Sequence, residues 1–204
     1  MTKADVRVLI AAPAPPIMLH MTNKNRSAAT WSAVKAKLGN FDRASLLGLV
    51  QDLYTTSKDN QNFLHARFGL GYGVLKPYKT IIDRWLWPDV YKHQEYSVSK
   101  AKKPISAYKK ASGLTEGVAE LTVYYCEQAI SFSNEVGLDD GAYYDALVRM
   151  FEQALKTVMA LPETERESLL DRLQDVRASG RGMGWGVEYA FNDLWQRAGL
   201  KFDN

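Results

Sequence analysis

The stretch TEGVAELTVYYCEQAISFSNEV, residues 115–136, decides the fold class of this chain. On a helix its apolar side chains leave little polar face; the main ones are Val118, Leu121, Val123, Tyr124, Tyr125, Cys126, Ala129, Ile130, Phe132 and Val136. A helix that is apolar nearly all round is stable in water only when other helices bury it. The stretch therefore predicts a helix at the centre of the molecule.

The segments on either side of this stretch also show helical spacing. Apolar residues recur every three or four positions after Asp42, and residues 42–68 are expected to form an αα-hairpin. Ser27 is expected to cap a preceding helix, and the capping-box pattern Thr164-x-x-Glu167 to start a later one. Residues 97–111 are helical in pattern but contain Pro104, which predicts a kink or a fresh helix start.

No segment shows the alternating pattern of a strand. We therefore predict an all-α protein of about seven to eight helices, arranged as an antiparallel bundle or as a short helical-repeat-like stack. The length of 204 residues suits one domain, expected over residues 27–204. Residues 1–26 contain three prolines within an apolar stretch and are expected to be a flexible arm. The prolines argue against a secretory signal, and internal Met18 and Met21 also allow a later start of the chain.

Composition narrows the class of protein further. The chain is 46% hydrophobic, which excludes a disordered protein, and it contains a single cysteine, which excludes a disulfide-stapled scaffold and a cysteine-based zinc site. It contains no uncharged apolar run long enough to span a membrane. These features predict a soluble cytoplasmic protein.

Charge is distributed unevenly along the chain. Residues 1–110 contain 18 Lys or Arg and 7 Asp or Glu, whereas residues 111–204 contain 8 and 16, so the overall +3 conceals a basic half and an acidic half. The densest basic segment runs from Lys92 to Lys110, and its candidate nucleic-acid contacts are Lys100, Lys102, Lys103, Lys109, Lys110 and the aromatic Tyr108. The same pattern also fits a solvated helix face, or basic and acidic halves that neutralise each other.

Other candidate site residues are few. Arg181 precedes a predicted helix start and is a candidate anion-binding residue. No Glu is followed three residues later by His, so a di-iron site is not expected, and neither a metal nor a cofactor is predicted. Cys126 is expected to be a core residue rather than a nucleophile. Should the protein be an enzyme with an unrecognised site, Arg181, Glu127 and His65 are its polar candidates.

Tryptophans and tyrosines gather near the predicted helix ends. This group consists of Trp85, Trp87, Trp185, Trp195, Tyr72, Tyr78 and Tyr91. Such residues either pack at the edge of a core or line a groove for a partner, because exposed aromatic side chains anchor interfaces.

Four blocks of sequence carry a resemblance: residues 46–68, 108–113, 120–137 and 182–195. In order and spacing they resemble a family of small uncharacterised all-helical bacterial proteins, and the first block resembles the leading helix pair of helical-repeat proteins. The resemblance implies an all-α bacterial cytoplasmic protein and offers no catalytic residues.

Together these observations favour a non-enzymatic protein-interaction module. Nucleic-acid binding through the basic segment is the first alternative, and an enzyme with an unrecognised site is the second. A protein partner is expected, a nucleic-acid partner and a homo-oligomer are open alternatives, and no membrane partner is predicted.

Overall fold

The computed structural model describes residues 29–201. The predicted arm, residues 1–26, and the predicted cap Ser27 lie outside the described residues. The chain divides into two compact units between Gly48 and Leu49. Most of the described residues belong to the second unit, which begins at Leu49.

Residues 29–201 fold into helices and contain no strand, which confirms the all-α prediction. These residues form nine α-helices rather than seven to eight. The helices are α1 (Trp31–Leu38), α2 (Arg43–Thr56), α3 (Lys58–Phe68), α4 (Lys76–Leu86), α5 (Val98–Ala111), α6 (Thr115–Val136), α7 (Gly141–Met159), α8 (Glu163–Ser179) and α9 (Val187–Arg197), with a 3₁₀ turn, η1, at Val90–Lys92.

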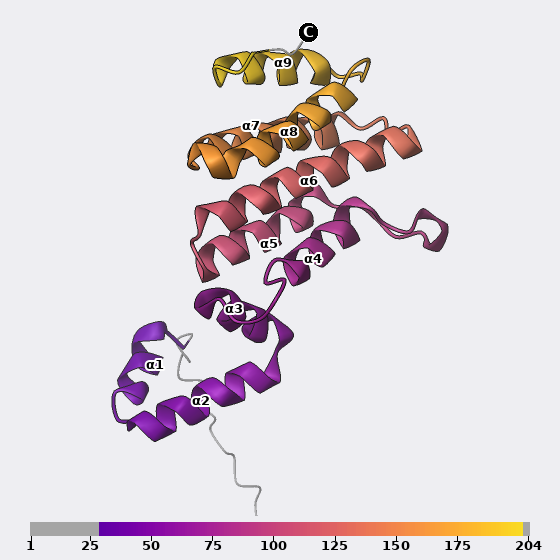
Figure 1. Cartoon of the computed structure of the whole chain (residues 1–204). Coiled ribbons are helices and arrows are strands. Elements are labelled where there is room, and N and C mark those ends of the chain that lie inside the picture. The colour runs from indigo at the N-terminus through magenta and orange to yellow at the C-terminus, as the bar shows by residue number, and fades with distance from the viewer. Residues whose placement is uncertain (1–28, 202–204) are drawn as a thin grey trace, which may run out of the picture. The chain divides into compact units, whose positions relative to one another are not determined.

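The second unit is a stack of helices with α6 at its centre. Figure 1 shows α3 to α9 following one another along this unit, and α6 contacts α4, α5, α7 and α8. Helix α4 contacts α6, and α6 contacts α8, so these three helices form one layer. Helix α3 packs on α5, and α7 packs on α9. The prediction of a central helix at residues 115–136 is therefore confirmed. The arrangement follows the helical-repeat-like alternative, in which neighbours stack in sequence order.

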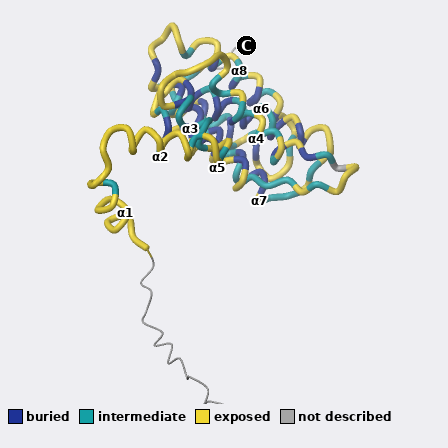
Figure 2. Tube along the Cα trace, turned by 90° about the horizontal axis from the view of Figure 1, so that it is seen from below, coloured by how far each residue is buried: buried dark blue, intermediate teal, exposed yellow. Residues whose placement is uncertain are grey.

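The core runs along this stack. Figure 2 shows the buried residues gathered in it, and twelve residues of α6 are buried. At the C-terminal end of the stack, Phe151 of α7 and Phe191 of α9 stack with their ring centroids 4.2 Å apart. Tyr143 of α7 donates its hydroxyl hydrogen to the carbonyl of Ala129 at 2.9 Å. Apolar burial and satisfied buried hydroxyls together hold α6 against its neighbours.

Two of the predicted helix starts differ from those in the structure. Thr30, not Ser27, caps α1, since its hydroxyl accepts the N–H of Ala33 and the helix begins only at Trp31. The capping-box prediction at Thr164 is wrong, because α8 already begins at Glu163 and Thr164 lies inside it. Pro162 is the N-cap residue of α8 and has no side-chain acceptor, so no side-chain cap forms there.

Helix α5 continues through Pro104 instead of starting afresh there. Residues 98–111 form one helix, and the proline ring is buried among the neighbouring helices. Pro104 has no N–H to donate to the carbonyl of Lys100, one turn earlier. Packing of the ring in the interior therefore compensates for a missing hydrogen bond.

Candidate interaction site

Helix α5 presents the basic segment of the chain to solvent. Its buried stripe consists of Ala101, Pro104, Ile105, Tyr108 and Ala111, and all five of its lysines are exposed. Because successive helix residues are rotated by about 100°, the lysines form two rows on opposite sides of the buried stripe. Lys100, Lys103 and Lys110 form one row, and Lys102 and Lys109 form the other.

The row that contains Lys100 and Lys103 borders a groove between α3, α4 and α5. This groove, called the α3–α5 groove below, has a volume of about 350 Å³. Its lining consists of Asp59, Asn62, Tyr78, Ile81, Trp85, Lys100, Lys103, Pro104 and Ala107. Among these, Tyr78, Ile81 and Pro104 are buried or half-buried and are called the floor, and the exposed Lys100 and Lys103 are called the wall. Charge and apolar surface therefore meet in one concave place.

Local structure explains why a lysine and a tryptophan meet in this groove. Ser97 caps α5 by accepting the N–H of Lys100, and its own N–H donates to the carbonyl of Trp85 at 2.8 Å. The cap therefore links the end of α4 to the start of α5. The Lys100 ammonium then lies 4.1 Å from the centroid of the Trp85 ring, a cation–π contact.

Tyr108 is buried, which corrects its predicted role as a nucleic-acid contact. Its side chain is only 4% exposed, and it packs edge-on against Tyr78 with ring centroids 5.3 Å apart. A base can stack only on an accessible ring face. Tyr108 therefore packs α5 against α4, and the exposed lysines are the part of the predicted site that faces solvent.

The two ends of the stack differ in charge. Helices α3, α4 and α5 together carry ten Lys or Arg residues and two Asp residues, whereas α6 to α9 carry six Lys or Arg and thirteen Asp or Glu. Since α3 to α9 follow one another in space, the charge asymmetry of the sequence becomes a basic end and an acidic end. Such a separation attracts anions to the α3–α5 end.

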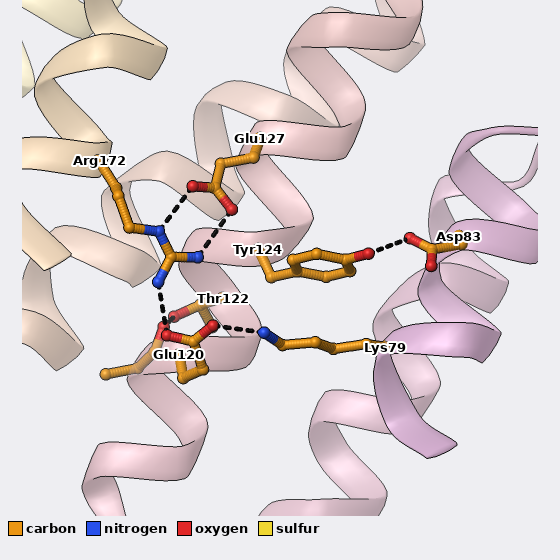
Figure 3. A network of polar contacts seen from close by, with 8 residues as sticks. Lys79, Asp83, Glu120, Thr122, Tyr124, Glu127 and Arg172 are labelled. Carbon is orange, nitrogen blue, oxygen red and sulfur yellow. Dashed lines mark hydrogen bonds and ion pairs between the residues drawn. The ribbon is translucent and has the colours of Figure 1, made fainter. Parts of the chain in front are cut away.

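A network of ion pairs connects α4, α6 and α8 (Figure 3). Arg172 of α8 binds both carboxylate oxygens of Glu127 at 2.7 Å and one oxygen of Glu120 at 2.6 Å. The other oxygen of Glu120 accepts from Lys79 of α4 at 2.6 Å. The Lys79 ammonium also lies 4.6 Å from the centre of the Tyr124 ring. The network therefore holds the three helices of one layer side by side.

Tyr124 extends the same network toward α4. Its hydroxyl donates to Asp83 at 2.7 Å (Figure 3). Desolvation raises the pKa of the Tyr124 hydroxyl, and its hydrogen bond to the Asp83 carboxylate raises it further. The hydroxyl therefore stays protonated and acts as a hydrogen-bond donor.

The three enzyme candidates are not brought together. Glu127 is engaged by Arg172, and His65 of α3 lies 3.0 Å from the hydroxyl of Tyr54. Arg181 is exposed in the turn after α8. In that turn the Glu188 carboxylate accepts the N–H of Gly182 at 2.9 Å. An anion at Arg181 would compete with Glu188, so anion binding there stays a prediction.

Cys126 lies in the core, as the sequence predicts. It is fully buried, and desolvation raises the pKa of its thiol well above the usual value. Within residues 29–201, no group of three or more His, Cys, Asp or Glu is placed to hold a metal ion.

A second surface is formed by α1, α2 and the turn that joins them, where the sequence shows apolar residues at helical spacing. Neither helix contains a buried residue. Seven large apolar residues are between 39% and 69% exposed: Trp31, Val34, Phe41, Leu46, Leu47, Val50 and Leu53. The helical spacing of these residues reveals an apolar face, but it does not reveal what covers that face. We call these seven residues the α1–α2 apolar surface; five of them lie in the first unit, and Val50 and Leu53 continue the row along the same helix, α2.

The aromatic residues near the helix ends divide between core and surface. Trp195 and Tyr78 are 3% and 5% exposed and belong to the core, and Tyr78 also lines the α3–α5 groove together with Trp85. Trp185 is 66% exposed and donates its indole N–H to Asp139 at 2.8 Å. Trp85 and Tyr78 therefore lie at a groove, and binding of a partner there stays a prediction.

Comparison of the chain with protein-family models, with curated proteins and with solved structures finds no match. The resemblance of four blocks to a bacterial helical family therefore stays a prediction. Among the helices of residues 29–201, none has the length and apolarity needed to cross a bilayer.

Proposed function

We propose that this chain is a non-enzymatic protein-interaction module that associates through α1 and α2. The observation that carries the proposal is the α1–α2 apolar surface. Its seven residues expose large side chains on two helices and, at Phe41, on the turn between them, and neither helix contains a buried residue. Apolar patches of this size on a folded protein usually mark a site where another protein docks.

The spacing of these residues indicates what kind of surface covers them. Leu46, Val50 and Leu53 are separated by four and three positions, which is the seam spacing of paired helices. Trp31 and Val34 begin a similar row on α1. A matching helical seam is therefore the expected partner, and a second copy of the chain supplies one.

The exposed area supports the same partner. With exposed fractions of 39–69% and roughly 150–250 Å² for a whole large side chain, the seven residues present on the order of 700 Å². A stable interface buries about 800 Å² on each partner. The surface is therefore large enough to hold two copies together, and homo-oligomerisation forms part of the proposal.

The test is the molar mass in solution, measured by light scattering after size exclusion at about 1 to 100 µM protein, where interfaces of this size are populated. We expect the wild-type chain at twice its monomer mass.

The double variant Leu47→Glu/Val50→Glu should be monomeric, because it places two charges in the seam. Ala44→Glu/Thr55→Glu is the matched control, with the same charges on the opposite side of α2, and should remain dimeric. A wild-type monomer throughout this range, or equal dissociation of both variants, would contradict the proposal.

Nucleic-acid binding is the second candidate function, favoured by the five exposed lysines of α5. A polyphosphate backbone interacts with all the lysines it can reach, and its affinity falls steeply with salt. Fluorescence anisotropy with single- and double-stranded probes at low and physiological salt measures this. Binding that persists at physiological salt and weakens for glutamate variants of either lysine row would favour this candidate.

A cytoplasmic location belongs to the same proposal. Its support is the single cysteine of the chain, Cys126, which is buried and unpaired with another cysteine. Disulfide bonds are common in proteins of oxidising compartments and rare in the cytosol.

A further inference from the structure

The α3–α5 groove combines apolar and basic side chains in one place, whereas the α1–α2 apolar surface consists of apolar residues alone. Its floor is formed by Tyr78, Ile81 and Pro104, and its wall by Lys100 and Lys103. The volume of about 350 Å³ falls within the range of specific ligand sites, which is ~300–1,000 Å³. A groove of this kind accepts an apolar side chain and a negative charge at the same time.

We propose that the α3–α5 groove binds an acidic segment of a partner protein, with an apolar or aromatic side chain of that segment on the groove floor. The inference rests on the proposed function, since it names a second partner class for an interaction module. It concerns residues that the α1–α2 apolar surface does not include.

Charge complementarity identifies the partner as acidic. Two lysines and one aspartate, Asp59, line the groove, so the lining itself is positive. The surrounding helices α3, α4 and α5 add a large excess of Lys and Arg. Glutamate or aspartate in a docked segment would meet Lys100 and Lys103 at the wall, where charge pairing selects the partner and speeds its association.

The aromatic residues favour a peptide over a nucleic acid. Trp85 already has the Lys100 ammonium 4.1 Å and the Arg84 guanidinium carbon 4.6 Å from its ring centroid. Tyr108 is buried. Neither ring is therefore placed to stack on a base, as binding of an unpaired strand requires. A peptide needs only an apolar floor and a charged rim, and both are present.

The two lysine rows of α5 allow a matched experiment. The probe is a fluorescein-labelled peptide of about twelve residues, the length scale of groove-binding segments, composed of Asp, Glu, Leu and Phe. We expect Lys100→Glu/Lys103→Glu to lower its affinity at least about tenfold. Lys102→Glu/Lys109→Glu makes the same change of charge on the opposite row and should alter the affinity less than about twofold.

A second pair of variants tests the floor without changing charge. Ala107 lines the groove and is exposed, whereas its neighbour Ser106 is exposed on the other side of α5. Ala107→Gln fills the groove and should lower peptide affinity at least about fivefold, whereas Ser106→Gln should not. A neutral peptide with Asn and Gln in place of the acids should bind at least about tenfold more weakly than the acidic one.

Three results would overturn the inference. One is absence of binding by the acidic peptide; another is equal loss of affinity in the two lysine variants, which would indicate diffuse charge attraction. The third is tighter binding of an oligothymidine of similar length than of the peptide, which would favour nucleic acid. Leu47→Glu/Val50→Glu should bind the peptide as the wild type does, so failure at the groove and failure of the proposed function are distinguishable.

Discussion

Tyr108 and Gly117 meet where α5 packs against α6, and this contact sets the spacing of the two helices. A Cβ atom on Gly117 would lie 2.2 Å from the Tyr108 hydroxyl oxygen and 2.5 Å from two ring carbons. Both residues are buried, so an added Cβ must displace the Tyr108 ring from its packed position. The sequence shows a glycine in an otherwise apolar helix, but only the position of the Tyr108 ring explains why a larger residue does not fit.

Gly117→Ala is expected to destabilise the protein by about 1–3 kcal/mol, because overpacking forces the Tyr108 ring to shift. The control is Gly48→Ala in α2, where nothing lies within 4 Å of the added Cβ. This change removes a helical glycine without a clash and should leave stability equal or slightly higher. Urea unfolding followed by circular dichroism measures both. Equal stability of Gly117→Ala and the wild type would show that the contact is not tight in solution.

Helices α4, α6 and α8 are joined by charged side chains as well as by apolar contacts. Glu120 lies at the centre, between Lys79 and Arg172. Burial raises the pKa of its carboxyl, but hydrogen bonds from Arg172 and Lys79 lower it more, so the net pKa lies below the ordinary value of about 4.5. A carboxylate held in this way stabilises the folded chain only while it is ionised.

The direction of the shift predicts how stability depends on pH. The pKa of Glu120 is lower in the folded than in the unfolded chain, so its contribution is complete above about 4.5 and is lost as pH falls through the folded pKa. Glu120→Gln should therefore unfold at lower temperature than the wild type near pH 7, and the difference should shrink below pH 4.5.

Thermal unfolding between neutral pH and about pH 3 checks this expectation. Glu116→Gln is the control, because Glu116 is exposed on the first turn of the same helix. Its unfolding temperature should stay close to that of the wild type at each pH. A gap between Glu120→Gln and the wild type that does not change with pH would contradict the assigned role of Glu120.

The whole chain consists of two units with different means of stabilisation. All of the buried hydrophobic residues from Ala66 to Trp195 lie in the second unit. The described part of the first unit, residues 29–48, contains no buried residue. In the proposed function, its exposed apolar side chains contribute to association.

Removal of residues 1–48 should leave the second unit folded. Because the buried core of residues 29–201 lies after residue 48, the unfolding temperature at low protein concentration should change by less than about 3 °C, which corresponds to less than about 1 kcal/mol for a domain of this size. Scanning calorimetry of the shortened and full chains measures the shift. A broad, non-cooperative transition in the shortened chain would show that the first unit contributes to the core.

Local residue spacing determined the existence of the helices and the central place of α6. Apolar periodicity is a property of neighbouring residues, so it can be read without knowing the fold. The density of lysines in α5 can likewise be read from the sequence without knowing the fold. Residue patterns also indicated an apolar face on α2, because the leucines recur at helical intervals.

Tertiary structure alone decided which of these residues meet. Arg172 is 45 residues from Glu127, and Lys79 is 41 residues from Glu120, so their pairing depends on how α4, α6 and α8 stack. The burial of Tyr108 and the choice of Lys100 and Lys103 as the groove-lining lysines depend in the same way on α3, α4 and α6. Local sequence determines which face of a helix is apolar, but contacts between distant segments determine what that face touches, because they form only when the chain packs.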